Sequence, residues 1–187
     1  MKLRLGILLL FGILSVAFIP AQNEINYKHK ALIKTLQKAG VKNLAAIEEI
    51  ALPDSVNTAN LIQGKYFLIN ENNANEYRYI YVGRVNSCRA DGCSITTSLP
   101  ADGNSEYFDY YILFDAKKTV QAVKVFNYQA THGQEITAKG WLKQFIGHNG
   151  SEPLQVDKNI DTISGATISV YAITFDVEMK TEILKEI

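Results

Sequence analysis

The sequence holds few of the residues on which metal centres and disulfide-rich scaffolds depend. Among 187 residues there are only two cysteines and three histidines. His29, His132 and His148 are too scattered to indicate a metal site by their spacing. No Cys-x-x-Cys or Cys-x-x-Cys-His run is present, so thioredoxin-like and c-type haem interpretations lack their motifs. We therefore predict no metal site.

An excess of charge is also lacking. The 19 basic and 19 acidic residues give a formal net charge of zero, so nucleic acid is not an expected partner. The sequence contains no Ser-His-Asp order, phosphate-binding loop or dinucleotide fingerprint. These absences leave no familiar catalytic motif from which to assign an enzyme class.

The amino-terminal segment has the pattern of a secretory signal. Lys2 and Arg4 precede an apolar or small run from Leu5 to Ile19, which Pro20 ends. We expect residues 1–21 to be removed as a signal peptide, with the mature protein starting near Gln22 in the periplasm. The alternative is an uncleaved membrane anchor, although the run is shorter than the roughly 20 residues that span a bilayer.

The two cysteines lie close together in the chain. Cys88 and Cys93 are separated by four residues that include Asp91-Gly92, a pair typical of turns. In an oxidising compartment, such a pair most often forms a structural disulfide, which we predict here. A redox-active dithiol and half of a metal site are the alternatives.

The remaining chain predicts one α+β domain, a mostly antiparallel sheet with helices packed on it. An N-terminal helical segment, residues 22–60, is expected to contain helices over Tyr27 to Ala39 and Asn43 to Ala51. Aromatic and β-branched residues predict the four strands of the sheet. These strands are Lys65 to Asn70, Glu76 to Val85, Tyr107 to Phe114 and Thr119 to Tyr128.

Two further helices are expected after the strands. Trp141, Leu142 and Phe145 share one face of a short helix over residues 139–145. At the C-terminus, apolar residues recur every four positions and predict a helix with one buried stripe, although alternate positions there also suit a strand. The stripe comprises Tyr171, Phe175, Met179, Ile183 and Ile187.

The heptad Asp161-Thr162-Ile163-Ser164-Gly165-Ala166-Thr167 precedes this last helix. Gly165 and Ala166 let another molecule approach the backbone closely, and glycine also permits a sharp turn. If the helix begins near Thr167, its free N–H groups and the positive end of its dipole suit a phosphate. An ordinary helix start, with Ser164 or Thr167 as the capping residue, is the alternative interpretation.

The heptad resembles the flavinylation motif of the FMN-binding domain family, which includes FMN-carrying subunits of the Rnf complex and of the sodium-pumping NADH:quinone reductase. The resemblance implies an FMN-binding domain over residues 61–187. It also implies that a flavin transferase joins the FMN phosphate to the hydroxyl of Thr167 as a phosphoester. Asp161, Ser164, Gly165 and Ala166 are the accompanying motif residues.

A second, upstream segment also resembles the family. Glu135, Thr137, Trp141, Gln144 and Phe145 match its pattern, but the Pro-Gly that often follows the threonine in the respiratory subunits is missing. The resemblance thus implies a tethered FMN but not membership of a respiratory pump. It implies cofactor contacts for Glu135, Thr137 and Trp141, and adjacent His132 is a further candidate. Solvated loop positions and core packing are the alternatives for these four residues.

The resemblance implies an exported flavoprotein that relays electrons between membrane or periplasmic redox proteins, and not a self-contained enzyme. A covalent tether would keep the cofactor with the protein after export. Two alternatives are a redox-sensing regulatory or assembly module, and an extracytoplasmic binding protein without flavin. The sequence does not give the oligomeric state.

Overall fold

A single antiparallel sheet forms the framework of the molecule. The computed structural model describes residues 24–53, 62–71, 76–89 and 105–187. Each strand pairs with the next one along the chain, which gives the order β1-β2-β3-β4-β5. The strands are β1 (Ile47–Ile50), β2 (Gly64–Ile69), β3 (Tyr79–Arg89), β4 (Ser105–Phe114) and β5 (Val120–Tyr128). The predicted α+β class and the four predicted strand positions are confirmed.

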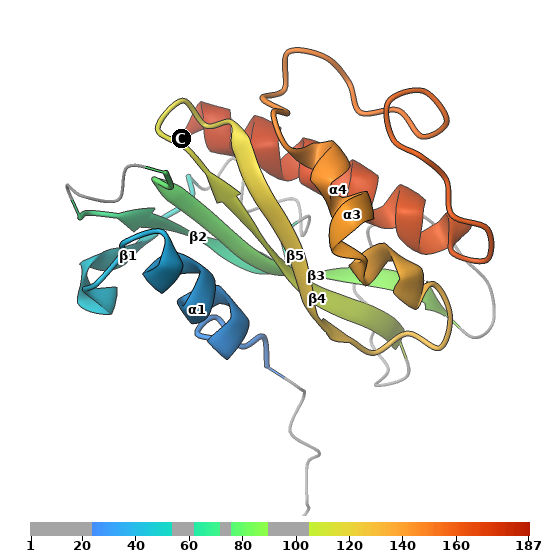
Figure 1. Ribbon diagram of the computed structural model, residues 1–187, viewed down its shortest axis with the longest axis horizontal. Coiled ribbons are helices and arrows are strands. Elements are labelled where there is room, and N and C mark those ends of the chain that lie inside the picture. The colour runs from blue at the N-terminus through green and yellow to red at the C-terminus, as the bar shows by residue number, and fades with distance from the viewer. Residues whose placement is uncertain (1–23, 54–61, 72–75, 90–104) are drawn as a thin grey trace, which may run out of the picture.

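Helices cover both faces of this sheet (Figure 1). The helix α1 (Lys30–Lys38) packs on one face, whereas α3 (Lys139–Leu142) and the long α4 (Thr167–Glu186) pack on the other. Three short 3₁₀ helices complete the described elements. These are η1 (Leu44–Ala46), η2 (Gln134–Thr137) and η3 (Lys143–Phe145).

The strand β4 shows why both faces must be covered. Its side chains alternate, so Phe108 and Tyr110 pack into the core beneath α4, whereas Tyr111 and Leu113 pack beneath α1. All four side chains are at most 1% exposed. The strand is therefore apolar on both faces, which requires a helix on each side of the sheet.

The helix predicted over Asn43 to Ala51 is wrong. Only η1 forms there, capped by the Asn43 side chain, and β1 follows it at once and pairs Ile47 with Ile69 of β2. Ile47 and Ile50 are β-branched and suit a strand, and the free edge of β2 supplies hydrogen-bond partners. Leu44, in η1, is 40% exposed.

The C-terminal helix is confirmed, but the predicted buried stripe is wrong. Tyr171 and Phe175 are 49% and 52% exposed. A step of four residues advances 40° around a helix with 3.6 residues per turn, so the four steps that join these five residues turn through about 160° and carry them off one face. The residues that face the sheet follow a mixed spacing of three and four. The apolar ones are Val170, Ile173, Val177 and Leu184.

A buried ion pair of α4 lies where two tyrosine hydroxyls join the helix to the sheet. Lys180 Nζ lies 2.7 Å from Asp176 Oδ1, one turn away on the same helix. The hydroxyl of Tyr110 in β4 donates to Asp176 Oδ2 at 2.5 Å, and that of Tyr66 in β2 donates to the Lys180 carbonyl at 2.8 Å. Burial, and then the Asp176 carboxylate, hold the pKa of Tyr110 well above its ordinary value. Tyr110 therefore keeps the proton with which it holds the helix.

Some predicted features lie outside the described residues. The expected signal segment, residues 1–21, is one of them, and the partner of Cys88 in the predicted disulfide, Cys93, is another. None of the helices that the structure describes combines the length and the hydrophobicity needed to cross a bilayer.

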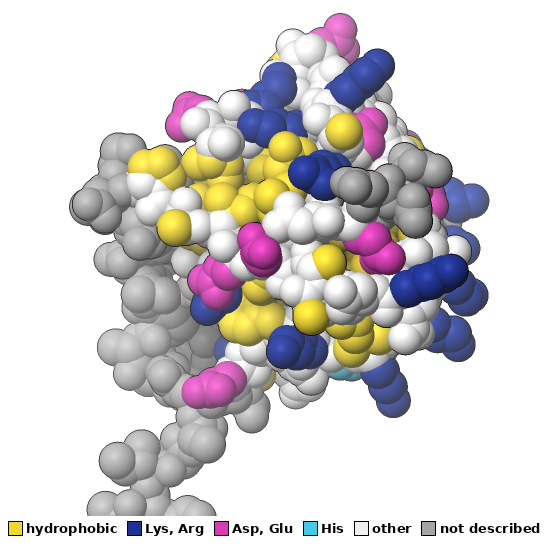
Figure 2. Space-filling view, turned by 90° about the vertical axis from the view of Figure 1, so that its left-hand side faces the viewer, with side chains coloured by type: hydrophobic (Ala, Val, Ile, Leu, Met, Phe, Trp, Pro, Cys, Tyr) yellow, Lys and Arg dark blue, Asp and Glu magenta, His cyan; other side chains and the backbone are white. Residues whose placement is uncertain are grey.

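One face of the molecule carries a mixed surface. Figure 2 views the molecule from the left-hand side of Figure 1, and basic and acidic side chains both appear there with hydrophobic atoms between them.

Replacing Asp176 with alanine should lower the free energy of unfolding by about 3–5 kcal/mol, because Lys180 would lose the carboxylate that compensates its buried charge. Adding Lys180→Met should recover much of that loss, since neither charge then remains buried. Urea denaturation followed by circular dichroism measures both variants.

The exposed residue Glu182 on the same helix provides the control, and Glu182→Ala should leave the unfolding midpoint unchanged. If Asp176→Ala cost less than about 1 kcal/mol, the value typical of an exposed pair, the ion pair would not be what holds α4 in place.

Candidate functional site

The start of α4 lies in the predicted motif, and Gly165 and Thr167 are exposed there. Thr167 is the first helical residue, which agrees with a helix start near this position. Gly165 has a φ of 82°, and a Cβ built on it would meet nothing within 4 Å. The capping position is Ala166, with no side-chain hydrogen bond, so the interpretation of Ser164 or Thr167 as the cap is wrong. The turn is therefore open, and no side chain caps the helix.

A cavity of about 550 Å³ lies beside this turn. Its volume falls in the range of about 300–1,000 Å³ that small-molecule sites occupy. Its walls come from β3, β4, the segment after β5 and the first turn of α4. The lining residues are Ser87, Glu106, Thr131, His132, Gly133, Gly165, Ala166, Thr167, Ile168 and Ser169.

Four predicted site residues meet in this cavity. They are His132, Gly165, Ala166 and Thr167, although 33 positions separate the first from the second. Ser87 and Glu106, which sequence analysis did not identify, also line it. A signal for them existed: each is two positions from a core residue of its strand, Val85 or Phe108, and alternation places it on the α4 face.

A chain of hydroxyl groups fixes the floor of the cavity. Tyr128 Oη donates to the His132 carbonyl at 2.5 Å, so its contact with Ser169 Oγ at 3.0 Å requires the serine to donate. Ser87 Oγ, 2.9 Å from Ser169 Oγ, must then donate to that serine. Burial raises the pKa of Tyr128. These hydrogen bonds from hydroxyl groups join β3, the first turn of α4, β5 and the His132 loop.

A second network lies in the wall next to His132. Thr131 directs both its backbone N–H, at 3.1 Å, and its hydroxyl to Glu106 Oε1. The same hydroxyl oxygen lies 3.0 Å from His132 Nδ1. The imidazole is thus oriented by Thr131, which Glu106 holds in place, although His132 itself is exposed.

Trp141 and Gln144 position the start of the heptad. Trp141 Nε1 donates to the Asp161 carbonyl at 2.8 Å, and Gln144 Oε1 accepts from the Asp161 N–H at 2.8 Å. Trp141 also packs edge-on against the buried ring of Phe145, with ring centroids 5.4 Å apart. These residues hold both backbone groups of Asp161, and neither residue lines the cavity.

Three other predicted site residues lie away from the cavity lining. Glu135 and Thr137 belong to η2, the former exposed and the latter half-buried, and Ser164 is exposed in the turn before Gly165. The two ends of the heptad therefore have different surroundings. Asp161 is held by side chains that precede the heptad, whereas residues 165–167 line the cavity.

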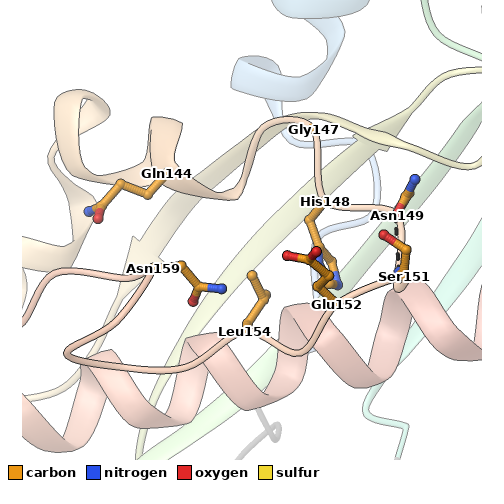
Figure 3. A pocket seen from close by; sticks show the side chains of 8 residues that line it. All are labelled: Gln144, Gly147, His148, Asn149, Ser151, Glu152, Leu154 and Asn159. Carbon is orange, nitrogen blue, oxygen red and sulfur yellow. Dashed lines mark hydrogen bonds between the residues drawn. The ribbon is translucent and has the colours of Figure 1, made fainter.

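A smaller cavity of about 190 Å³ occurs elsewhere (Figure 3). It lies among η3, the segment that follows it and the loop to Asn159, and Gln144 and His148 contribute to its lining. Burial, and then the charge of Lys185, lower the pKa of His148. None of the residues in our predicted site lines this cavity, which makes it the weaker candidate.

The larger cavity has the chemistry of an anion site with a nucleophile beside it. The first N–H groups of a helix have no intrahelical acceptor, and the helix dipole adds positive potential there. The exposed Thr167 hydroxyl and the open backbone at Gly165 lie at the same turn. A phosphate fits this arrangement, both as a bound group and as a group esterified to the threonine.

Comparison with known proteins agrees with this chemistry. Residues 103–178 match the model of a family described as the FMN-binding domain. The matched span runs from the residues before β4 to the middle of α4 and contains the heptad. No curated protein sequence matches the chain.

Two glycines provide a matched test of the cavity wall. Gly133 and Gly165 both have positive φ, so alanine at either should cost about 1–2 kcal/mol from backbone strain. At Gly133 the new Cβ would also lie 2.6 Å from Ser169 Oγ and 2.9 Å from Tyr128 Oη. Gly133→Ala should therefore destabilise the protein by about 1–3 kcal/mol more than Gly165→Ala. Equal unfolding free energies in urea titrations would contradict the close packing at Gly133.

Proposed function

Because this chain is a member of the FMN-binding domain family, we propose that it carries FMN covalently, through a phosphoester between the cofactor phosphate and Thr167 Oγ1. A flavin transferase makes the bond. The observation that carries the proposal is the exposed Thr167 hydroxyl at the first turn of α4, inside the larger cavity.

The placement of the hydroxyl groups in the heptad supports Thr167 as the attachment site. Thr162, Ser164 and Thr167 are all exposed, but only Thr167 lines the cavity. A flavin on Thr167 is therefore next to a space large enough for part of it, whereas the other two hydroxyls offer no such space.

The residues around Thr167 fit the phosphate. The N–H groups of the first turn and the helix dipole stabilise its charge, and Gly165 leaves room on the preceding turn. His132, across the same cavity, supplies a polar contact from the loop after β5. The walls formed by Ile168 and Ala166 give the apolar contacts that a flavin ring needs.

We further propose that the protein is exported and relays electrons between membrane or periplasmic redox proteins. FMN accepts two electrons and passes them on one at a time, and the protein supplies tethering, orientation and electrostatic tuning. A covalent bond prevents cofactor loss in a compartment that has no access to the cytoplasmic FMN pool. The amino-terminal signal pattern supports the extracytoplasmic location.

Intact-mass analysis and in-gel flavin fluorescence test the attachment. The protein exported from cells that contain a flavin transferase should gain the mass of one FMN minus water, and its bands should fluoresce after denaturation. The same mass should place the mature N-terminus near Gln22. Thr167→Ala should abolish both the added mass and the fluorescence, because it removes the attacking oxygen.

Thr162→Ala is the matched control, since it removes an exposed hydroxyl of the same heptad that does not line the cavity. It should retain the full added mass. Unmodified wild-type protein, or flavin that persists in Thr167→Ala, would refute the assignment.

A further inference from the structure

The hydrogen-bond network around Thr131 determines which nitrogen of His132 carries a proton. Glu106 Oε1 accepts the Thr131 N–H and also the Thr131 hydroxyl hydrogen. A hydroxyl has only one hydrogen, so the Thr131 oxygen must act as acceptor in its 3.0 Å contact with His132 Nδ1. The Nδ1 atom therefore carries a hydrogen and donates it to Thr131.

This proton position defines what the other ring nitrogen can do. In a neutral imidazole with its hydrogen on Nδ1, the lone pair lies on Nε2, which becomes the acceptor. A base that is oriented by a third group and lies near a hydroxyl is the arrangement by which proteins activate hydroxyl nucleophiles. Here Thr131, which Glu106 holds in place, is the third group that orients the histidine.

The backbone of the His132 loop is held at the cavity as well. Tyr128 bonds to the His132 carbonyl, and Ser169 of α4 bonds to the same tyrosine. Gly133 packs so closely on Ser169 that a Cβ there would lie 2.6 Å from its Oγ. The loop and the first turn of α4 are therefore fixed relative to each other, with His132 and Thr167 on the same cavity.

We infer that His132 Nε2 accepts the proton of the Thr167 hydroxyl when the phosphoester forms, with Thr131 and Glu106 as positioning residues. The inference rests on the proposed attachment at Thr167. It assigns part of the proton transfer to the protein that is modified, in addition to whatever the transferase contributes.

The step balances without any change of oxidation state. Free FMN would have to expel hydroxide, so the donor must carry its phosphate in a phosphoanhydride, as flavin adenine dinucleotide does. Thr167 Oγ1 forms a bond to the phosphorus of the FMN half, and the anhydride bond to AMP breaks. AMP leaves with the bridging oxygen, and the hydroxyl proton moves to His132 Nε2 and then to solvent.

The rate of modification tests the role of His132. Full-length purified protein is incubated with a flavin transferase and flavin adenine dinucleotide, and intact mass is followed with time. His132→Gln should slow attachment about 10²–10⁴-fold, the usual contribution of a general base. Thr131→Val should also slow attachment, because it removes the group that orients the ring. His29→Gln, a histidine change on the opposite face of the sheet, should leave the rate unchanged.

Chemical rescue separates a proton acceptor from a structural role. His132 is exposed, so His132→Gly leaves room for a soluble base, and added imidazole should restore much of the rate. A His132→Gln rate equal to wild type, or a slow His132→Gly that imidazole does not accelerate, would overturn the inference while attachment at Thr167 stands. If wild-type protein itself is never modified, the proposed function fails first.

Discussion

The buried pair of Asp176 and Lys180 is the constraint on which the position of α4 depends. Removing two charges from water costs several kcal/mol per ion, and only close pairing with further hydrogen bonds offsets that cost. Tyr110 of β4 supplies such a bond to the Asp176 carboxylate, and Tyr66 of β2 donates to the backbone carbonyl of Lys180. An apolar contact would tolerate sliding of the helix, whereas these directional bonds fix its rotation and its height over the sheet.

That fixed rotation determines what the first turn of α4 presents. With Val170, Ile173 and Val177 facing the sheet, Ser169 points to the hydroxyl groups of Ser87 and Tyr128, and Thr167 remains exposed beside the cavity. The polar bonds at the first turn of α4 and those at Asp176 and Lys180 farther along the helix thus act together. Thr167 itself is positioned by a rigid helix and not by a free loop, which favours reproducible geometry at its hydroxyl.

The sequence predicted the features that depend on local chemistry and missed those that depend on distant partners. Aromatic and β-branched runs located four strands, and the small residues of the heptad located the turn at Thr167. The strand β1 was missed because its pairing with β2 was not visible locally. Ser87 and Glu106 were missed as site residues for the same reason, since strand pairing and helix packing bring them to Thr167. Trp141, which we expected at the cofactor, donates to the Asp161 carbonyl, a contact that the sequence did not indicate.

The hydrogen bonds from Trp141 and Gln144 to the Asp161 backbone determine where the chain before the heptad can change in length. Both backbone groups of Asp161 are held by side chains 17 and 20 positions earlier, so the chain between them is a closed loop with a fixed end. Closing a longer loop costs little, about 0.6 kcal/mol for each doubling of its length. Residues inserted within the exposed stretch 151–153 should therefore cost little stability, and the threonine downstream should keep its place.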